Sequence, residues 1–268
     1  MEFRTIVDVP KAPFQIEPRE EMLFVGSCFA DSIGRRFQNE QFRATVNPFG
    51  TMYNPASVLH TIERYEGKPR IVFITLGTNH VYRLKETGEI VDNCQKRPAA
   101  LFQEEQMTVD ECADYLCRAI DLLRSRRPEV HVVLTVSPIR YRKYGYHESQ
   151  LSKATLLLAV DHVMSTFNVQ RSTFTVTYFP AYEIVMDELR DYRFYADDML
   201  HPSSQAVEYI WERLVDSCFS PLAKEFLREW APLKAALAHR PFNPDSPEYR
   251  QFMAETRAKV DTLLNRYH

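Results

Sequence analysis

Four apolar segments, each ended by a turn-forming residue, set the strongest limit on how this chain can fold. They are Met22–Val25, Ile71–Leu76, Val130–Val136 and Phe174–Phe179, and each is followed by Gly, Ser or Pro. Continuous apolar runs of this length are typical of parallel strands that are buried on both faces. The intervals between them leave room for helical crossovers. The sequence therefore predicts an α/β fold, a three-layer α/β/α sandwich with a mostly parallel central sheet.

Helical patterns fill the intervals and the end of the chain. One helix is expected over about Ser149–Phe167, and another after Ser203 or Ser204. From Pro221 onward the pattern is helical only, with a break at Pro241–Pro247 that separates two final helices. We predict one domain over residues 1–220 and a C-terminal helical extension over residues 221–268, which packs on or beside it and offers a surface for a homodimer.

The charge balance limits the partners. The formal net charge is −3, so no broad positive field is available to bind nucleic acid or an anionic membrane, and we expect neither partner. Asp8 and Pro10 interrupt the stretch where a secretory signal would be apolar, and Leu156–Val160 is too short to cross a bilayer. A cytoplasmic location is expected.

The chain has five cysteines, an odd number, and no two of them have Cys-x-x-Cys spacing. We therefore interpret them as reduced thiols. Cys112 and Cys117 lie on one apolar helical stripe behind Thr108 and Glu111, which form a capping box. Core packing is favoured there over a metal or redox site, because buried free cysteine behaves as a small hydrophobic residue. We expect no metal and no cofactor.

Nucleophilic side chains follow the first predicted strand directly. Gly26, Ser27 and Cys28 precede Phe29, Ile33 and Phe37, which have helical spacing. A thiol or hydroxyl at that turn lies at a helix N-terminus, where N–H groups and the dipole favour a thiolate or an oxyanion. The structural alternative is that Gly26 makes a tight turn, Ser27 caps the helix and Cys28 packs.

Two further motifs carry polar groups that suit catalysis. Gly77 and Asn79 follow the second predicted strand, and the asparagine amide can donate to an oxyanion, although Asn after Gly also closes ordinary turns. His80 beside them is a possible base, with a surface or structural role favoured. Asp198 lies three residues before His201, a spacing at which a carboxylate can hold the imidazole in one tautomer. A helix-entry turn explains the same residues.

The order of these motifs resembles the SGNH hydrolases, whose blocks are a GDS nucleophile turn, a loop glycine, a G-x-N segment and D-x-x-H. The string GSCFA at Gly26–Ala30 resembles the motif that names the GSCFA family, an SGNH-like group. NPFGTMYNP, LGTNHVY, TVSPIR, SQLSKATL and DDMLHPS also resemble that family, so the resemblance covers roughly residues 20–215. It implies a flavodoxin-like arrangement of the sheet.

The resemblance also implies roles for single residues. Gly26 matches the block-one glycine, Gly50 the loop glycine, Asn79 the oxyanion amide, and Asp198 with His201 the acid and base. Ser27 then falls on the usual aspartate and Cys28 on the usual serine, although a shift of one residue would restore Ser27 as nucleophile. We favour Cys28, because a thiolate paired with an imidazolium is a strong nucleophile near neutral pH. His80 replaces an aspartate that often follows this asparagine.

A basic, tyrosine-rich segment follows the third predicted strand. Arg140 can hold a carboxylate or phosphate, and Lys153 can add a second positive charge, but a solvated basic loop is favoured for both. Tyr141, Tyr144 and Tyr146 can form a stacking wall for a sugar or simply pack.

Two functions are consistent with these motifs. The first is an SGNH-like hydrolase or acyltransferase that acts on the acyl ester of a small molecule, a carbohydrate or a cell-wall component. The alternative is a non-catalytic binding or scaffold protein on the same fold, suggested by the missing aspartate of GDS.

Overall fold

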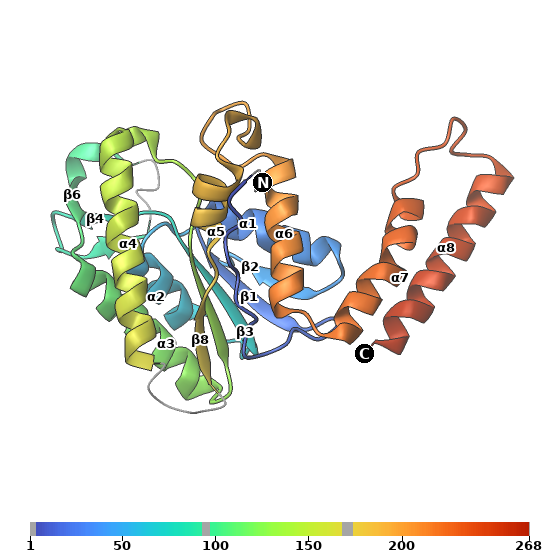
Figure 1. The fold of residues 1–268 in the computed structure, drawn as a ribbon, viewed down its shortest axis with the longest axis horizontal. Helices are drawn as coiled ribbons and strands as arrows, with labels where there is room; N and C mark the ends of the chain where they lie inside the picture. Colours follow the sequence, from blue (N-terminus) through green and yellow to red (C-terminus); the bar gives the residue numbers. More distant parts are fainter. Residues whose placement is uncertain (1–3, 93–96, 168–173, 268) are drawn as a thin grey trace.

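The computed structural model describes residues 4–92, 97–167 and 174–267 (Figure 1). At its centre is a parallel five-stranded sheet with the strand order β2-β1-β3-β7-β8. The strands are β1 (Glu21–Gly26), β2 (Arg43–Val46), β3 (Ile71–Leu76), β7 (His131–Val136) and β8 (Thr175–Tyr178). The four predicted strands are confirmed, and β2 is an edge strand that the sequence analysis did not identify. Counted along the chain, the order is that of flavodoxin-like sheets.

Helices cover both faces of this sheet, so the three-layer prediction is confirmed (Figure 1). One face carries α1 (Cys28–Asn39) and α6 (Ser204–Cys218), and the other carries α2 (Pro55–Arg64), α3 (Val109–Arg126) and α4 (Tyr146–Phe167). Shorter helical segments are η1 (Ala99–Leu101), η2 (Arg142–Tyr144), α5 (Ala181–Glu183), the π-helix η3 (Ile184–Leu189) and η4 (Tyr192–Phe194).

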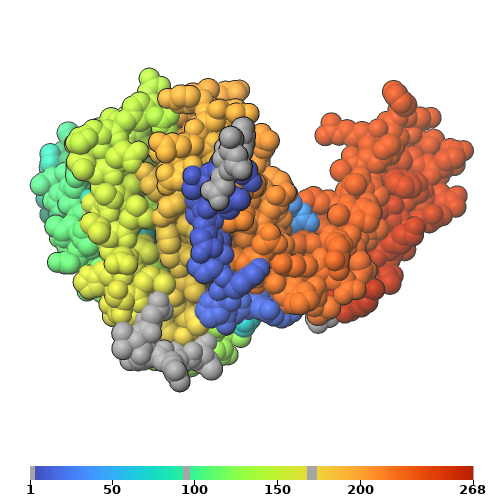
Figure 2. Space-filling view, viewed as in Figure 1, coloured from blue at the N-terminus to red at the C-terminus, as the bar shows by residue number. Residues whose placement is uncertain are grey.

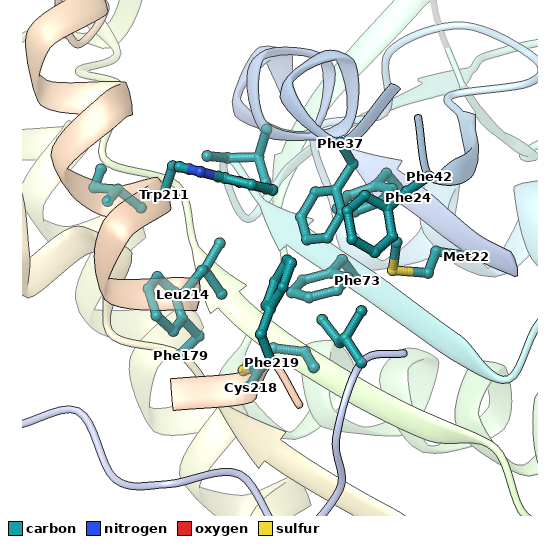
Figure 3. Close-up of a cluster of buried hydrophobic side chains, with 14 of the residues drawn as sticks. Met22, Phe24, Phe37, Phe42, Phe73, Phe179, Trp211, Leu214, Cys218 and Phe219 are labelled. Carbon is teal, nitrogen blue, oxygen red and sulfur yellow. The ribbon is translucent and has the colours of Figure 1, made fainter. Parts of the chain in front are cut away.

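Aromatic side chains fill the layer between the sheet and the pair α1–α6 (Figure 3). Phe24 on β1 stacks on Phe73 of β3 with ring centroids 4.7 Å apart. Phe37 of α1 lies 5.0 Å from Phe24 and 4.8 Å from Trp211 of α6. Because these rings interlock, the turn between β1 and α1 is held in a fixed position relative to the helix that follows His201.

A second, antiparallel sheet lies beside the main one, with the order β5-β4-β6. It consists of β4 (His80–Leu84), β5 (Ile90–Val91) and β6 (Phe102–Gln106). No pattern in the sequence predicted it. Its strand β4 begins directly after the Gly77–Asn79 segment, so the pairing of β4 with β6 holds one side of that segment.

The predicted capping box and cysteine stripe are both present in α3. Thr108 and Glu111 bond each other's backbone N–H groups. Cys112 is completely buried, and burial raises the pKa of its thiol to about 12. Cys117 is half-buried and packs against the same core. Neither thiol therefore has the surroundings of a reactive cysteine. The fifth cysteine, Cys94, lies outside the described residues.

The two predicted C-terminal helices are present as α7 (Pro221–Leu237) and α8 (Pro247–Arg266). They form a hairpin that projects from the body of the molecule as an arm (Figures 1 and 2). At its base, Trp230 Nε1 donates to the carbonyl oxygen of Asn39 at 3.0 Å, and Lys234 pairs with Glu40 at 2.5 Å. The domain boundary at residue 220 and the homodimer stay predictions.

Candidate active site

The turn between β1 and α1 requires glycine at its first position. Gly26 has φ +139°, and a Cβ atom there would lie 2.0 Å from the carbonyl oxygen of Thr75. Ser27 follows as the N-cap of α1 and is completely buried. Its Oγ accepts from the N–H of Phe29 at 3.3 Å and lies 3.1 Å from Thr75 Oγ1. The capping role proposed for Ser27 is therefore present, and its hydroxyl already has two partners.

Cys28 is the first residue of α1 and is only half-buried. Its Sγ lies 3.4 Å from the hydroxyl of Tyr53. Burial, followed by the contact with the thiol, raises the pKa of Tyr53 above its ordinary value. Tyr53 therefore keeps its proton at neutral pH and is a suitable hydrogen-bond donor to a thiolate. No motif in the sequence gave Tyr53 a role, and its only signal was its place in a loop rich in Pro, Gly and Asn.

The same loop fixes the nucleophile turn through Asn47. Its Oδ1 accepts from the N–H of Gly26 and its Nδ2 donates to Asp31, both at 2.9 Å. Gly50 has φ +98°, and its N–H donates to the carbonyl of Asn47 at 2.9 Å. The predicted oxyanion donor Gly50 is therefore engaged in a turn. Asn47, which was not selected, holds the loop to β1.

The Gly77–Asn79 segment lies directly against the turn that carries Ser27 and Cys28. A Cβ atom on Gly77 would lie 3.3 Å from Ser27 Cβ, and the N–H groups of Gly77 and Thr78 both donate to the carbonyl of Tyr53 at 2.8 Å. Asn79 is buried, with its Nδ2 donating to the carbonyl of Met107 at 2.7 Å. The structure thus brings Gly77 to the turn, while one amide hydrogen of Asn79 is used elsewhere.

Lys153 is buried beneath this motif, so the prediction that it belongs to a solvated basic loop was wrong. α4 begins at Tyr146 and turns Lys153 towards the sheet, where its Nζ donates to the carbonyl of Gly77 at 2.6 Å. Its side chain is completely enclosed, and burial lowers its pKa to about 7. A desolvated amine loses the hydration that stabilises its charge.

His80 begins β4 and has a structural environment. Its ring stacks on Tyr144 with centroids 3.8 Å apart, and its Nδ1 lies 3.3 Å from Glu104 Oε1 without the alignment of a hydrogen bond. Burial lowers its pKa, against an opposing effect of Glu104. Tyr144 in turn stacks on Tyr141 at 5.7 Å. These two tyrosines therefore pack against other rings rather than forming an open wall.

The Asp-x-x-His motif has the geometry of an oriented imidazole. Asp198 Oδ2 lies 2.6 Å from His201 Nδ1, and Asp198 Oδ1 accepts from the N–H groups of Leu200 and His201 at 2.8 and 3.0 Å. These backbone and side-chain bonds lower the pKa of Asp198 to about 2. The carboxylate is therefore ionised at neutral pH and leaves Nε2 of His201 for proton transfer.

Shared neighbours connect this motif to the nucleophile turn. The N–H of Arg140, after β7, donates to the carbonyl of Leu200 at 3.1 Å. The next residue, Tyr141, packs edge-on against Tyr53, which contacts Cys28. All three motifs thus lie at the carboxyl edge of the sheet, where α/β proteins bind ligands. Direct approach of His201 to Cys28 stays a prediction.

In the part of the chain that the structure describes, no three His, Cys, Asp or Glu side chains are grouped so as to hold a metal ion. Within those same ranges, none of the helices has the length and apolar character that a membrane crossing requires.

Comparison with known proteins identifies the family and the fold. The model of the GSCFA family matches residues 21–71 and 66–214, and that of the GSCFA domain protein C-terminal domain matches residues 230–268. No curated protein matches. A solved structure described as a GDSL-like lipase from Parabacteroides merdae is 11% identical, with a TM-score of 0.50 over 78% of this chain and 98% of that chain.

Other solved structures are more distant. An acetylxylan esterase mutant from Geobacillus stearothermophilus is 13% identical, with a TM-score of 0.47 over 77% of this chain and 98% of that one. A carbohydrate esterase family 3 protein from Talaromyces cellulolyticus is 11% identical, with a TM-score of 0.44 over 78% and 98%. At 11% identity, the likeness to the GDSL-like lipase structure is one of fold alone.

Proposed function

Because this chain belongs to the GSCFA family, we propose that it is an ester hydrolase or acyltransferase of SGNH type with Cys28 as its nucleophile. The observation that carries the proposal is the contrast between two adjacent side chains. Ser27 is completely buried and caps α1, whereas the half-buried thiol of Cys28 faces the hydroxyl of Tyr53. A nucleophile must reach its substrate, and only the second side chain is placed to do so.

The proposed reaction passes through a thioester. His201 Nε2 takes the thiol proton, and Sγ of Cys28 attacks the acyl carbonyl carbon to form a C–S bond. The intermediate collapses with cleavage of the ester C–O bond, and the leaving alkoxide takes the proton from the imidazolium. Water or an acceptor hydroxyl then attacks the thioester as His201 removes its proton. The C–S bond breaks, which releases the acid or new ester, and the thiolate takes the proton back from the imidazolium of His201. Asp198 stabilises the imidazolium in both halves.

The oxyanion needs donors at the start of α1. The N–H of Cys28 lies in the first turn, where helix N–H groups have no intrahelical acceptor. Asn79 can donate its second amide hydrogen to the oxyanion, because the carbonyl of Met107 accepts only one. Gly50 is not proposed as a donor, since its N–H already donates to the carbonyl of Asn47.

Intact-mass spectrometry after exposure to p-nitrophenyl acetate tests the proposal. We expect an acetyl adduct that maps to Cys28 and is cleaved by hydroxylamine, as a thioester is. It should be absent from Cys28→Ala, present in Ser27→Ala and much slower to form in His201→Ala. An adduct that persists in Cys28→Ala and maps to Ser27 would reverse the assignment.

The alternative is a binding or scaffold protein on this fold, and the engaged Gly50 N–H favours it. Iodoacetamide labelling distinguishes the two functions. A catalytic Cys28 reacts faster than free cysteine and depends on His201. A rate equal to that of free cysteine and indifferent to His201→Ala, with no acyl adduct, would support the scaffold.

A further inference from the structure

A cavity of about 290 Å³ opens beside the loop that carries Asp198 and His201. It lies between the segment after β7, the start of α4 and the residues from η3 to η4. Two arginines and three tyrosines dominate its lining: Arg140, Arg190, Tyr146, Tyr192 and Tyr195. Neither Cys28 nor His201 lines it, so it is distinct from the reacting groups.

The cavity carries an excess of positive charge. The guanidinium of Arg140 lies 4.3 Å from the ring centroid of Tyr146 and 5.4 Å from that of Tyr195, and its Nη1 donates to the carbonyl of Met199 at 3.2 Å. Arg190 is exposed, and across the described ranges no carboxylate pairs with it. The one lining carboxylate, Asp191, is paired with Arg193 at 3.2 Å. An anion entering the cavity therefore meets two cations.

Two of the three tyrosines in the cavity lining are exposed to solvent, and Tyr195 is half-buried. Tyr192 is 69% exposed and Tyr146 is 48% exposed. Tyr192 and Tyr195 lie 6.3 Å apart with tilted rings. Exposed aromatic faces beside polar groups are typical of ligand sites, because they offer flat apolar area with hydrogen-bonding groups at the rim. A sugar ring presents the matching combination of C–H faces and hydroxyl groups.

The backbone connects this cavity to the catalytic motif. The N–H of Ala196 donates to the carbonyl of His201 at 2.8 Å, and the N–H of Ser203 donates to the carbonyl of Phe194 at 2.8 Å. One loop therefore supplies Tyr192 and Tyr195 to the cavity and His201 to the chemistry. A ligand that contacts Tyr192 and Tyr195 is therefore bound by the same loop that carries the imidazole of His201.

We propose that this cavity binds the sugar unit of the ester substrate and that this unit carries a negative charge, as a carboxylate or a phosphate. This substrate class rests on the proposed function, but the binding site itself does not need catalysis. Tyr146, Tyr192 and Tyr195 form the faces against which the ring stacks, and Arg140 and Arg190 bind its anionic group.

Calorimetric titration with four probes tests the proposal: methyl β-glucuronide, glucose 6-phosphate, methyl β-glucoside and inorganic phosphate. We expect at least one charged sugar to bind more tightly than both the neutral sugar and inorganic phosphate. Whichever of methyl β-glucuronide and glucose 6-phosphate binds more tightly identifies the anionic group as a carboxylate or a phosphate. Equal affinity for the charged and neutral sugars would overturn the proposal. So would inorganic phosphate that binds as tightly as the sugar phosphate.

Variants separate the two halves of the site. Arg190→Asn suits the backbone at that position, where φ is 44°, and should weaken the charged sugar about 3- to 5-fold, as for an exposed ion pair, while sparing the neutral one. Tyr192→Ala should weaken every sugar. Arg142→Asn is the matched control, since Arg142 is exposed and is not part of the lining. An equal loss in Arg142→Asn would contradict the site.

The same titrations in Cys28→Ala keep this test apart from the proposed function. Binding of charged sugars should persist in Cys28→Ala, whereas the same binding by a wild-type protein that forms no acyl adduct would leave the cavity assigned and the chemistry wrong. Acyl chemistry without preferential binding of charged sugars would leave the nucleophile assigned and this substrate class wrong.

Discussion

Tyr53 and Cys28 form a contact that no linear motif indicates. The tyrosine lies in the loop before α2 and the cysteine opens α1. Asn47 helps to bring them together, because it holds that loop against β1. The hydroxyl keeps its proton and can donate to the sulfur as a thiolate forms. In the proposed mechanism Tyr53 therefore positions and stabilises the nucleophile Cys28, and its effect can be measured without knowing the substrate.

Replacing Tyr53 with phenylalanine removes the hydroxyl and keeps the ring against Tyr141. The attacking thiolate then lacks a hydrogen-bond donor that stabilises its charge, so alkylation of Cys28 by iodoacetamide should slow about 3-fold. Quantitative mass spectrometry of the Cys28 peptide gives the rate. Tyr115→Phe on α3 is the control. An unchanged rate in Tyr53→Phe would show that the contact has no role in activating the thiol.

Lys153 links the stability of the fold to pH. Its folded pKa of about 7 lies below the ordinary value of 10.5. Between these values the unfolded chain binds a proton that the folded chain does not, so the free energy of unfolding rises with pH. The gain in the free energy of unfolding is complete above the unfolded pKa of Lys153, and it is lost as the pH falls towards 7. Its slope is at most about 1.4 kcal/mol per pH unit.

Lys153→Met keeps most of the side-chain volume and removes the titration. From pH 7 to pH 9, the stability of the wild type relative to this variant should increase by about 2 kcal/mol, as measured by urea unfolding. Lys259→Met, at an exposed position on α8, should follow the wild type at every pH. A constant difference between wild type and Lys153→Met would mean that the folded amine is not neutral at pH 9.

At the level of helices and strands, α1 shows how one element can position a nucleophile. Ser27 satisfies the first-turn N–H of Phe29, and Cys28 then begins the helix with its side chain only half-buried. In the proposed division of roles, Ser27 is the structural residue and Cys28 the chemical one. The division predicts different consequences for their removal.

Ser27→Ala should cost about 1 kcal/mol of stability, which is the usual effect of losing an N-cap, and somewhat more because Thr75 Oγ1 loses one of its two contacts with Ser27. Ser203→Ala removes the equivalent cap of α6, where Oγ accepts from the N–H of Ala206, and should cost a similar amount. Chemical denaturation measures both. A folded Ser27→Ala protein that no longer forms the acyl adduct would contradict the division.

Local sequence patterns were sufficient to predict the strands that consist of continuous apolar runs. The apolar runs predict β1, β3, β7 and β8, because strands buried on both faces need no alternation. β6 reads FQEEQ and is largely exposed, so its apolar content is too low to indicate a strand. α2 was missed although Asn54 caps it and Pro55 stands at its first position, a readable signal within an apparent loop.

The site was predictable only where its geometry is local. Asp198 and His201 are three residues apart, and their contact follows from one turn. The burial of Lys153 depends on how α4 lies on the sheet, and the roles of Asn47 and Tyr53 depend on where a long loop crosses β1. Such contacts are set by tertiary packing, which a pattern along the chain does not contain.

At the scale of the whole molecule, the arm formed by α7 and α8 touches the body chiefly near its base, and its far end stands clear of the domain (Figure 2). Trp230 is 2% exposed and donates to Asn39 at the end of α1. Phe226 is completely buried and lies edge-on to Phe42 of the body, with centroids 6.1 Å apart. The arm therefore depends on a small apolar joint, whereas the sheet is held by two helical layers.

Weakening that joint should loosen the arm and leave the sheet intact. Trp230→Ala removes a buried ring and a hydrogen bond, a loss of about 3–5 kcal/mol for a buried tryptophan. Hydrogen exchange should therefore speed up in α7 and α8, while β3 and β7 keep their protection, because regions with few buried contacts open locally. Arg228→Ala, on an exposed position of the same helix, should change neither region. Uniformly faster exchange across the sheet would instead show that arm and sheet unfold as one cooperative unit.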